Sequence, residues 1–238
     1  MEDELAKEVD SIIRGTWELR NGQVIPDTQD IKLSNDGVKI QATVLYSDLA
    51  DSTELALYSQ EIAAEIYKSY LLGTTRIIKA NGGEVRAFDG DRVMGVFIGD
   101  RKNSSAAKAA LKINYFFTHI LQAQFLAFYP HLGSSPFKFA QCSGIDTGEI
   151  RVARAGIRNN NDLVWVGRAP NIAAKLSSIR EAGFASYITA DVFAKLNDSA
   201  KLFNGAAMWE SRTWAKGEPY GTKSVYRSSW WLKPSYAG

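Results

Sequence analysis

The sequence contains very few residues that build disulfides or metal clusters. Its 238 residues include one cysteine, Cys142, and two histidines, His119 and His131. A single cysteine cannot form a disulfide within the chain or a cysteine metal cluster. The two histidines lie in no spacing typical of metal ligands, so we expect both to be structural.

Neither sign of charge is in clear excess. The 28 Lys and Arg residues are mixed with 26 Asp and Glu residues, which leaves a formal net charge of +2. Without a basic block, the sequence predicts no surface for nucleic acid. A metal-bound triphosphate is a better match for this charge balance than a polymer.

The sequence also has no long apolar run. The first residues, MEDELAKEVDSII, are acidic and amphipathic, unlike the basic and then apolar pattern of a signal peptide. The longest apolar region, Ile113 to Tyr129, is too polar for a membrane span. It is interrupted by Asn114, Thr118, His119, Gln122 and Gln124. We therefore expect a soluble, cytoplasmic protein without a membrane partner.

The hydrophobic content of 45% is sufficient for one sizeable core. We expect an N-terminal helix around Glu2 to Leu19 and an irregular arm in residues 1–38, and then one catalytic domain in residues 39–238. Its C-terminal extension, Trp209 to Tyr236, holds four tryptophans with Lys and Arg between them. Such a pattern can stack nucleobases, but we favour tryptophans that pack at a sheet edge or a subunit contact.

The order of predicted elements indicates an α+β fold. We expect a strand at Ile40 to Ser47, a long helix capped by Asp51, Ser52 and Thr53 that ends at Asn81, and a hairpin with its Asp-Gly turn between Glu84 to Phe88 and Arg92 to Ile98. The later predictions are a helix at Ser104 to Phe128, a strand at Phe137 to Ile145 turned by Asp146 to Gly148, a loop at Asn159 to Asp162, a strand at Leu163 to Val166, a helix at Ala169 to Ile179, a strand at Ser186 to Thr189 and a helix at Asp191 to Leu196. This order predicts a ferredoxin-like sandwich, with a mainly antiparallel sheet flanked by helices.

Two aspartates are the strongest chemical signal. Asp48 directly follows the strand motif VLYS, and Asp91 lies at the tip of the predicted hairpin. If the two strands are neighbours, both carboxylates can bind the same pair of divalent ions, Mn²⁺ or Mg²⁺, for phosphoryl chemistry. Asp89 is a third carboxylate nearby, but its place in an Asp-Gly turn already explains it.

A helix that starts after Asp48 can also bind phosphate. The backbone N–H groups from Leu49 to Thr53 and the hydroxyls of Ser52 and Thr53 are suitable donors. The alternative is purely structural: Ser52 and Thr53 cap a helix, and Asp48 is an exposed strand end.

Four motifs in order resemble class III nucleotidyl cyclases: YSDLADST, FDGDRVMGVF, GIDTGEI and VGRAPNIAAKL. The resemblance covers roughly Ala42 to Tyr226. It implies a two-metal cyclase that releases pyrophosphate, with Asp48 and Asp91 as metal ligands. It also implies a head-to-tail homodimer whose active sites lie at the subunit interface.

The same resemblance assigns roles to two residues of the other subunit. Asn171 would orient the ribose, and Lys175 would neutralise charge on the α-phosphate from the position where the family has arginine. The two positions are one helical turn apart and so share a face. Lysine departs from the family, because an ammonium cannot make the planar, bidentate contact of a guanidinium. The alternative for Lys175 is a solvated helix lysine.

The positions that read the base differ even more from the family pattern. The lysine and aspartate that adenylate cyclases of this class use are replaced by Ala87 and Val164. Nearby are Tyr46, where the family commonly has phenylalanine, and Arg86, a donor for acceptors on a base edge. This combination resembles the pyrimidine cyclases of the bacterial Pycsar antiphage system, which make cyclic UMP or cyclic CMP. We expect UTP to be favoured over CTP, although Arg86 suits either base; alternatively, Tyr46 is sheet core and Arg86 a surface residue.

Three other functions stay open. A purine cyclase could read adenine or guanine through other side chains. A catalytically silent domain could bind nucleotide and dimerise, although close carboxylates repel unless a metal uses them. A diguanylate-forming domain should carry a Gly-Gly-Asp-Glu-Phe-like hairpin, which FDGDR is not. In the favoured function, a cyclic-nucleotide receptor is a partner only through the product.

Overall fold

A single large sheet organises the chain. The computed structural model describes residues 1–215 and 222–234, and its main sheet has nine strands, in the order β10-β11-β7-β5-β2-β4-β3, with β1 added beside β2 and β6 beside β5. The strands are β1 (Glu18–Asn21), β2 (Asp36–Leu49), β3 (Glu84–Asp89), β4 (Arg92–Phe97), β5 (Gln141–Ile157), β6 (Asn160–Val166), β7 (Ser186–Thr189), β10 (Glu210–Ala215) and β11 (Thr222–Ser228); β8 (Leu202–Phe203) and β9 (Ala206–Ala207) form a separate small hairpin. Two contacts in the main sheet are parallel, β1 with β2 and β5 with β7, and the others are antiparallel.

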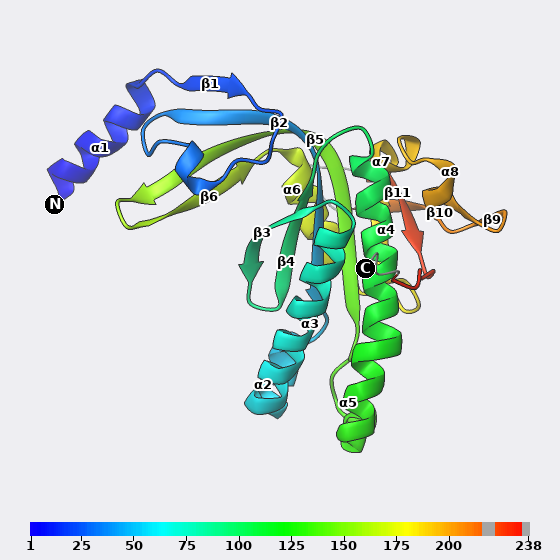
Figure 1. Ribbon diagram of the computed structural model, residues 1–238. Coiled ribbons are helices and arrows are strands. Elements are labelled where there is room, and N and C mark those ends of the chain that lie inside the picture. The colour runs from blue at the N-terminus through cyan, green and yellow to red at the C-terminus, as the bar shows by residue number, and fades with distance from the viewer. Residues whose placement is uncertain (216–221, 235–238) are drawn as a thin grey trace.

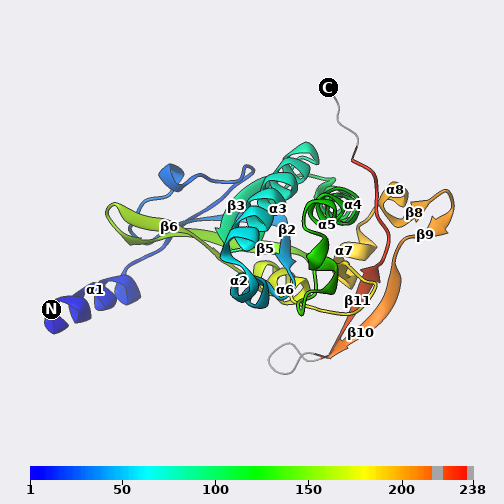
Figure 2. The same ribbon diagram turned by 90° about the horizontal axis from the view of Figure 1, so that it is seen from below.

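Helices cover both faces of this sheet (Figures 1 and 2). The helices of the described chain are α1 (Glu2–Arg14), α2 (Ser52–Tyr58), α3 (Gln60–Ala80), α4 (Lys102–Tyr115), α5 (Gln122–Phe128), α6 (Arg168–Ser177), α7 (Ala190–Ala194) and α8 (Asp198–Lys201), with a π-helical turn at Phe116–Leu121 and 3-10 turns at Thr28–Asp30 and Pro130–Ser134. Of these, α1 extends away from the sheet and buries no residue (Figure 1). The predicted α+β fold with a mainly antiparallel sheet is therefore confirmed.

The two faces of the sheet have different apolar cores, because side chains alternate along β2. Leu45 and Leu49 pack with α3 and α4 in the larger core. Val44 lies on the opposite face, in a second core that α6 covers. On that face α6 lies directly on β5: a Cβ added to Gly144 would be 2.2 Å from the carbonyl oxygen of Ala173. Glycine at position 144 therefore permits the close approach of α6 to the sheet.

Several predicted element boundaries were wrong. The long helix expected after Ser52 is interrupted at Ser59, whose hydroxyl accepts a hydrogen bond from the backbone N–H of Ile62 and so caps α3 as a second helix. The segment Asp146 to Gly148 does not turn, because β5 continues through it to Ile157. Asp146 is stable inside the sheet since Thr189 donates a hydrogen bond to its Oδ1 at 2.6 Å.

The predicted loop at Asn159 to Asp162 is mostly strand. The turn between β5 and β6 consists of Arg158 and Asn159, since Ile157 pairs with Asn160. Asn159 has a φ of 68°, a left-handed conformation that asparagine tolerates. The N-terminal helix is also shorter than expected: it ends at Arg14, and β1 follows.

The tryptophans of the C-terminal extension mostly pack against the sheet and its helices. Trp209 is 6% exposed, and its indole N–H donates to the carbonyl of Ala200 at 2.8 Å. Trp214 and Trp230 pack at the edges of apolar cores, whereas Trp231 is 46% exposed. Structural packing of this extension, the favoured interpretation, is confirmed for the first three; Tyr236 lies outside the described residues. No helix within the described ranges has the length and apolar character that crossing a membrane requires.

Candidate active site

The pairing of β2 with β4 brings Asp48 and Asp91 to the same end of these strands. Ser47 in β2 pairs with Val93 in β4, so Asp48 lies one residue beyond this pair and Asp91 two residues before it. The β3–β4 hairpin is present, with Gly90 and Asp91 as its two loop residues because Asp89 pairs with Arg92. The turn is thus one residue later than predicted, and Gly90 supplies the positive φ of 59°.

Two arginines hold Asp48. This aspartate is 6% exposed, and its Oδ2 accepts hydrogen bonds at 3.1 Å from both Arg92 and Arg180. The same Nη2 of Arg180 also donates to the backbone carbonyl of Leu49 at 2.8 Å. A single guanidinium nitrogen therefore lies against two oxygens that could bind a cation.

Asp91 forms no ion pair of its own within the described residues. Its Oδ2 is buried and has no hydrogen-bond partner among the described residues. Partial burial, followed by the negative charge of Asp48, raises the pKa of Asp91 above its ordinary value. A partly buried carboxylate beside another, with one oxygen left without a partner, is typical of a site that needs a positive ion.

The residues after Asp48 form a short turn and a short helix. Asp51 has a left-handed φ of 51° and accepts a hydrogen bond from the backbone N–H of Lys138 at 2.8 Å, so it does not cap α2 with its side chain. Ser52 starts α2, and its carbonyl accepts a hydrogen bond of 2.7 Å from the Tyr67 hydroxyl. Thr53 is exposed. Of the two hydroxyls expected to meet phosphate, that of Ser52 lies within hydrogen-bonding reach of Asp91. The helix α2 that follows has only seven residues.

The donor set is suitable for divalent ions. It contains the carboxylates of Asp48 and Asp91 and the carbonyl of Leu49, all oxygen ligands of the kind that Mg²⁺ and Mn²⁺ prefer. In the part of the chain that the structure describes, no three His, Cys, Asp or Glu side chains gather into a ligand cluster. The remaining ligands would therefore have to come from phosphate oxygens and water, which is usual for Mg²⁺.

Asn171 and Lys175 lie on α6, on the same face of the sheet as Asp48. The helix buries Ile172, Ala173 and Leu176 against the sheet. Asn171 is exposed and Lys175 half-buried on the other side of the helix. The structure thus brings these two positions together, one turn apart, but Asn171 has no side-chain hydrogen bond to either aspartate within the described chain.

Tyr46 lies two residues before Asp48, so it is on the α6 face of β2. It packs against the core that includes Met94, and burial raises the pKa of its phenol. Both interpretations of Tyr46 are therefore compatible with its position, because a half-buried phenol can belong to the core and still border a pocket.

Arg86 is the extra residue of a β-bulge in β3, since the pairing shifts between Val85 and Ala87. Its guanidinium forms ion pairs with Asp27, at 2.5 Å, and with Glu84. The side chain is only 14% exposed, so it is not the free surface residue of the structural alternative. To contact a base it would have to exchange these partners.

The sequence did not predict Arg180 and Arg92 as site residues. Arg92 was detectable, because it follows Asp91 in FDGDR and lies opposite Asp48 in the sheet. Arg180 is separated from Asp48 by 132 positions, so only the path of the chain after α6 reveals the contact.

Close relatives match nearly the whole chain. A uridylate cyclase from Xanthomonas perforans is 44% identical over 232 residues, 97% of this chain and 97% of the relative. A uridylate cyclase from Rhodovulum sp. (strain MB263) is 40% identical over 235 residues, 98% of this chain and 97% of the relative. A third, from Burkholderia cepacia, is 42% identical over 215 residues, 89% of this chain and 91% of the relative. No protein-family model matches the sequence.

Solved structures of nucleotide cyclases have the same fold. The adenylyl cyclase CyaB from P. aeruginosa has a TM-score of 0.66 at 22% identity, over 81% of this chain and 95% of that chain. The guanylyl cyclase Cya2 has a TM-score of 0.66 at 18% identity, over 83% of this chain and 96% of that chain. At these identities the likeness shows the fold alone, and it confirms the class III cyclase fold that the four motifs predicted.

Proposed function

Because the chain belongs to the uridylate cyclase family and is a nucleotidyl cyclase, we propose that it converts UTP into 3′,5′-cyclic UMP and pyrophosphate. The observation that carries this proposal is the position of Asp48 and Asp91 at one edge of the sheet, with an unsatisfied, buried carboxylate oxygen on Asp91. The names of the relatives at 40–44% identity support UTP as the substrate.

In this proposal Asp48, Asp91 and the Leu49 carbonyl hold two divalent ions. Ions bound there would supply activation of the ribose 3′ hydroxyl and neutralisation of the triphosphate charge for in-line attack on the α-phosphate. Arg180 must leave Asp48 and Leu49 before these oxygens can bind a metal, because its guanidinium now contacts both. Ser52, Thr53 and the nearby N–H groups bind phosphate oxygens.

The active site of the proposed enzyme is shared by two subunits. Asn171 is exposed on the outer side of α6, where it can meet a nucleotide held by the aspartates of a second chain. There it orients the ribose, and Lys175 neutralises the charge that develops on the α-phosphate. A head-to-tail homodimer would contain two such sites.

Base selection in this proposal depends on Tyr46 and Arg86. A phenol on the α6 face of β2 narrows the space beside Asp48 and favours a one-ring base. Arg86 donates to an acceptor on the base edge after exchange with Asp27 or Glu84. CTP is the second candidate substrate, because cytosine also presents an O2 acceptor. By the resemblance to Pycsar cyclases, the product would serve as a signal in bacterial antiphage defence.

Incubation of the purified full chain with each of the four nucleoside triphosphates and Mn²⁺, followed by mass analysis of the products, tests this function. We expect cyclic UMP as the main product, less cyclic CMP, and little cyclic AMP or GMP. An Asp48→Asn variant is the control for a contaminating cyclase. A preference for ATP or GTP would indicate a purine cyclase, and no product with any nucleotide would favour the silent regulatory domain.

A further inference from the structure

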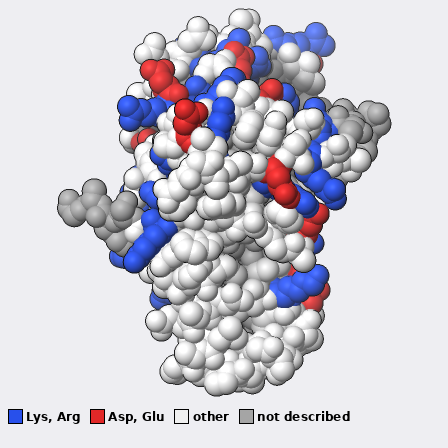
Figure 3. Space-filling view, turned by 90° about the vertical axis from the view of Figure 1, so that its right-hand side faces the viewer, with Lys and Arg blue, Asp and Glu red and all other residues white. Residues whose placement is uncertain are grey.

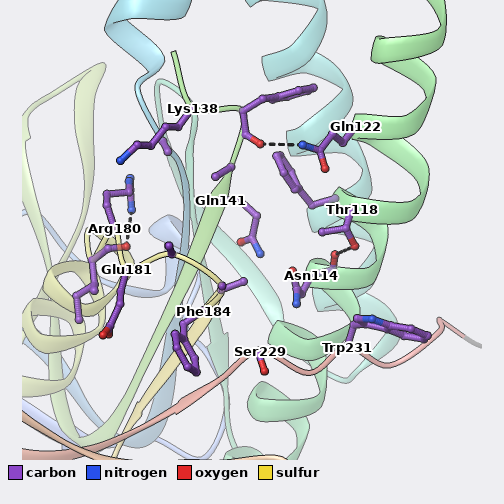
Figure 4. Close-up of a pocket in the computed structure, with 18 of the residues that line it drawn as sticks. Asn114, Thr118, Gln122, Lys138, Gln141, Arg180, Glu181, Phe184, Ser229 and Trp231 are labelled. Atoms are coloured by element: carbon purple, nitrogen blue, oxygen red, sulfur yellow. Dashed lines mark hydrogen bonds between the residues drawn. The ribbon is translucent and has the colours of Figure 1, made fainter. Parts of the chain in front are cut away.

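A cavity lies at the same end of the strands as Asp48 but on the opposite face of the sheet. It has a volume of about 440 Å³ and lies between the helical run from α4 to α5, the start of β5 and the segment after α6 (Figure 4). We call it the Gln141 pocket. Cys142 pairs with Asp48 in the sheet, so these two side chains lie on the same face. Gln141 is the neighbour of Cys142 in β5, so its side chain lies on the opposite face.

Four large aromatic side chains contribute to the walls of the Gln141 pocket. Phe117, Phe139, Phe184 and Trp231 line it. The chain from Ile113 to Phe137 contains no Asp, Glu, Lys or Arg, and Figure 3 shows the resulting uncharged surface in the lower part of the molecule, where α5 lies. A flat apolar molecule would find ring surfaces on several sides of this cavity.

One polar group inside the pocket lacks a partner. Gln141 is 5% exposed, and its Oε1 accepts hydrogen bonds from the hydroxyls of Ser47 at 3.3 Å and Ser143 at 3.4 Å. Its Nε2 is buried and makes no hydrogen bond within the described residues. Figure 4 places this amide in the middle of the pocket, near Asn114. A buried donor of this kind favours a ligand that brings an acceptor oxygen.

The charge at the mouth of the pocket is positive. Lys138, Arg180 and Glu181 are the charged residues that line it. Glu181 is already neutralised, because its carboxylate contacts Arg227, the Tyr187 hydroxyl at 2.8 Å and Arg212 at 3.4 Å. The ammonium of Lys138 has no ion-pair partner in the described chain. An anion at this mouth would meet the ammonium of Lys138 and, beside it, the guanidinium of Arg180, which also contacts Asp48.

We propose that the Gln141 pocket binds a small aromatic anion, at a site separate from the nucleotide. The ring system of this ligand packs between Phe139, Phe184 and Trp231. An acceptor oxygen of the ligand accepts a hydrogen bond from Nε2 of Gln141, and its negative group faces Lys138 and Arg180. Because Arg180 also contacts Asp48, the pocket has a physical link to the candidate metal site.

Two fluorescent probes test this inference on the full chain: 1-anilinonaphthalene-8-sulfonate, an aromatic anion, and N-phenyl-1-naphthylamine, the same ring system without the sulfonate. We expect saturable binding of the anion at one site per subunit, at least tenfold tighter than binding of the neutral probe. Ala182→Trp, at an exposed residue that lines the pocket, should weaken it at least tenfold. Ala123→Trp, at an exposed residue of α5 outside the pocket, is the matched control and should bind as the wild type does.

Two further measurements separate the parts of the proposal. Lys138→Gln should weaken binding of the anionic probe severalfold and leave the neutral probe unchanged, because the Lys138 backbone contact with Asp51 is retained. Saturating UTP should not displace the anionic probe. Equal binding by the two tryptophan variants would show that the pocket is not the site. An equal affinity for both probes would refute the preference for anions, and displacement by UTP would refute a site separate from the nucleotide.

Discussion

Two regions of the chain differ in how much of the proposed chemistry each contains. One is the end of β2 and β4 that carries Asp48 and Asp91, here called the carboxylate edge, and the other is the outer side of α6. At the carboxylate edge, β-sheet register fixes Asp48 near Asp91, and two arginines already contact Asp48. On α6, Asn171 is exposed and has no hydrogen bond to either aspartate. In the proposed function, one chain therefore binds the metal, whereas catalysis requires the α6 of another chain.

The largest effect should follow removal of a metal ligand. Asp48→Asn or Asp91→Asn should lower the rate of cyclisation by about 10²–10³-fold or more, because each removes a charge that holds the metal in the transition state. Asp89→Asn, at an exposed residue of the same hairpin, is the matched control and should retain most of the activity. Steady-state product formation measures the effect. Near wild-type rates in either of the first two variants would contradict the two-metal assignment.

A smaller effect should follow changes in the proposed base pocket. Arg86→Gln should lower UTP turnover about tenfold while triphosphate binding changes little, because a charge-assisted contact to the base is lost but the phosphates still hold the ligand. Tyr46→Phe should raise the ratio of purine to pyrimidine products, since the hydroxyl that narrows the pocket is absent. Competition assays with mixed nucleotides give both ratios. If neither variant changes the nucleotide profile, the base lies elsewhere.

Arg180 tests whether the carboxylate edge is blocked in the absence of metal. Arg180→Gln should tighten Mn²⁺ binding about threefold to tenfold, because a partly exposed ion pair worth about 1 kcal/mol no longer competes for Asp48. Arg212→Gln is the control. It also removes one arginine ion pair, that with Glu181, but this pair does not involve Asp48. Electron paramagnetic resonance of free Mn²⁺ measures the affinity. Unchanged or weaker binding would mean that Arg180 supports the site.

The smallest effect concerns stability without metal. The pKa of Asp91 is raised in the folded protein, so its ionised form opposes folding, and this cost appears as the pH rises above its ordinary value of 3.8. Asp91→Asn should therefore stabilise the metal-free protein at pH 7 by about 1 kcal/mol or less, since the group is partly exposed. The gain should fade as the pH approaches 3.8. Urea unfolding at several pH values measures it; a destabilised variant at pH 7 would contradict the argument.

Local patterns predicted several elements of the chain correctly. Ser186 to Thr189 was predicted as a strand and is β7, and the Asp-Gly pattern predicted the β3–β4 hairpin. The same local reasoning was wrong at Asp146 to Gly148, because a polar residue and a glycine resemble a turn until a distant partner is known. That partner is Thr189, which is adjacent only through the pairing of β5 with β7.

The candidate site shows the same limit. The positions of Asp48 and Asp91 followed from two short motifs, since each motif ends a strand. The Arg180 contact with Asp48 could not be predicted, because it depends on how the chain continues after α6. Likewise, no sequence pattern near Arg86 indicated that its guanidinium would form an ion pair with Asp27.

A heterodimer of two inactive chains tests the shared site most directly. Asp48→Asn and Asn171→Ala chains with different tags are co-expressed, and the mixed dimer is purified through both tags. If each site takes its carboxylates from one chain and its Asn171 from the other, one of the two sites is intact. We expect about half of the wild-type rate per dimer, with both parent homodimers inactive. An inactive mixed dimer would contradict the shared site.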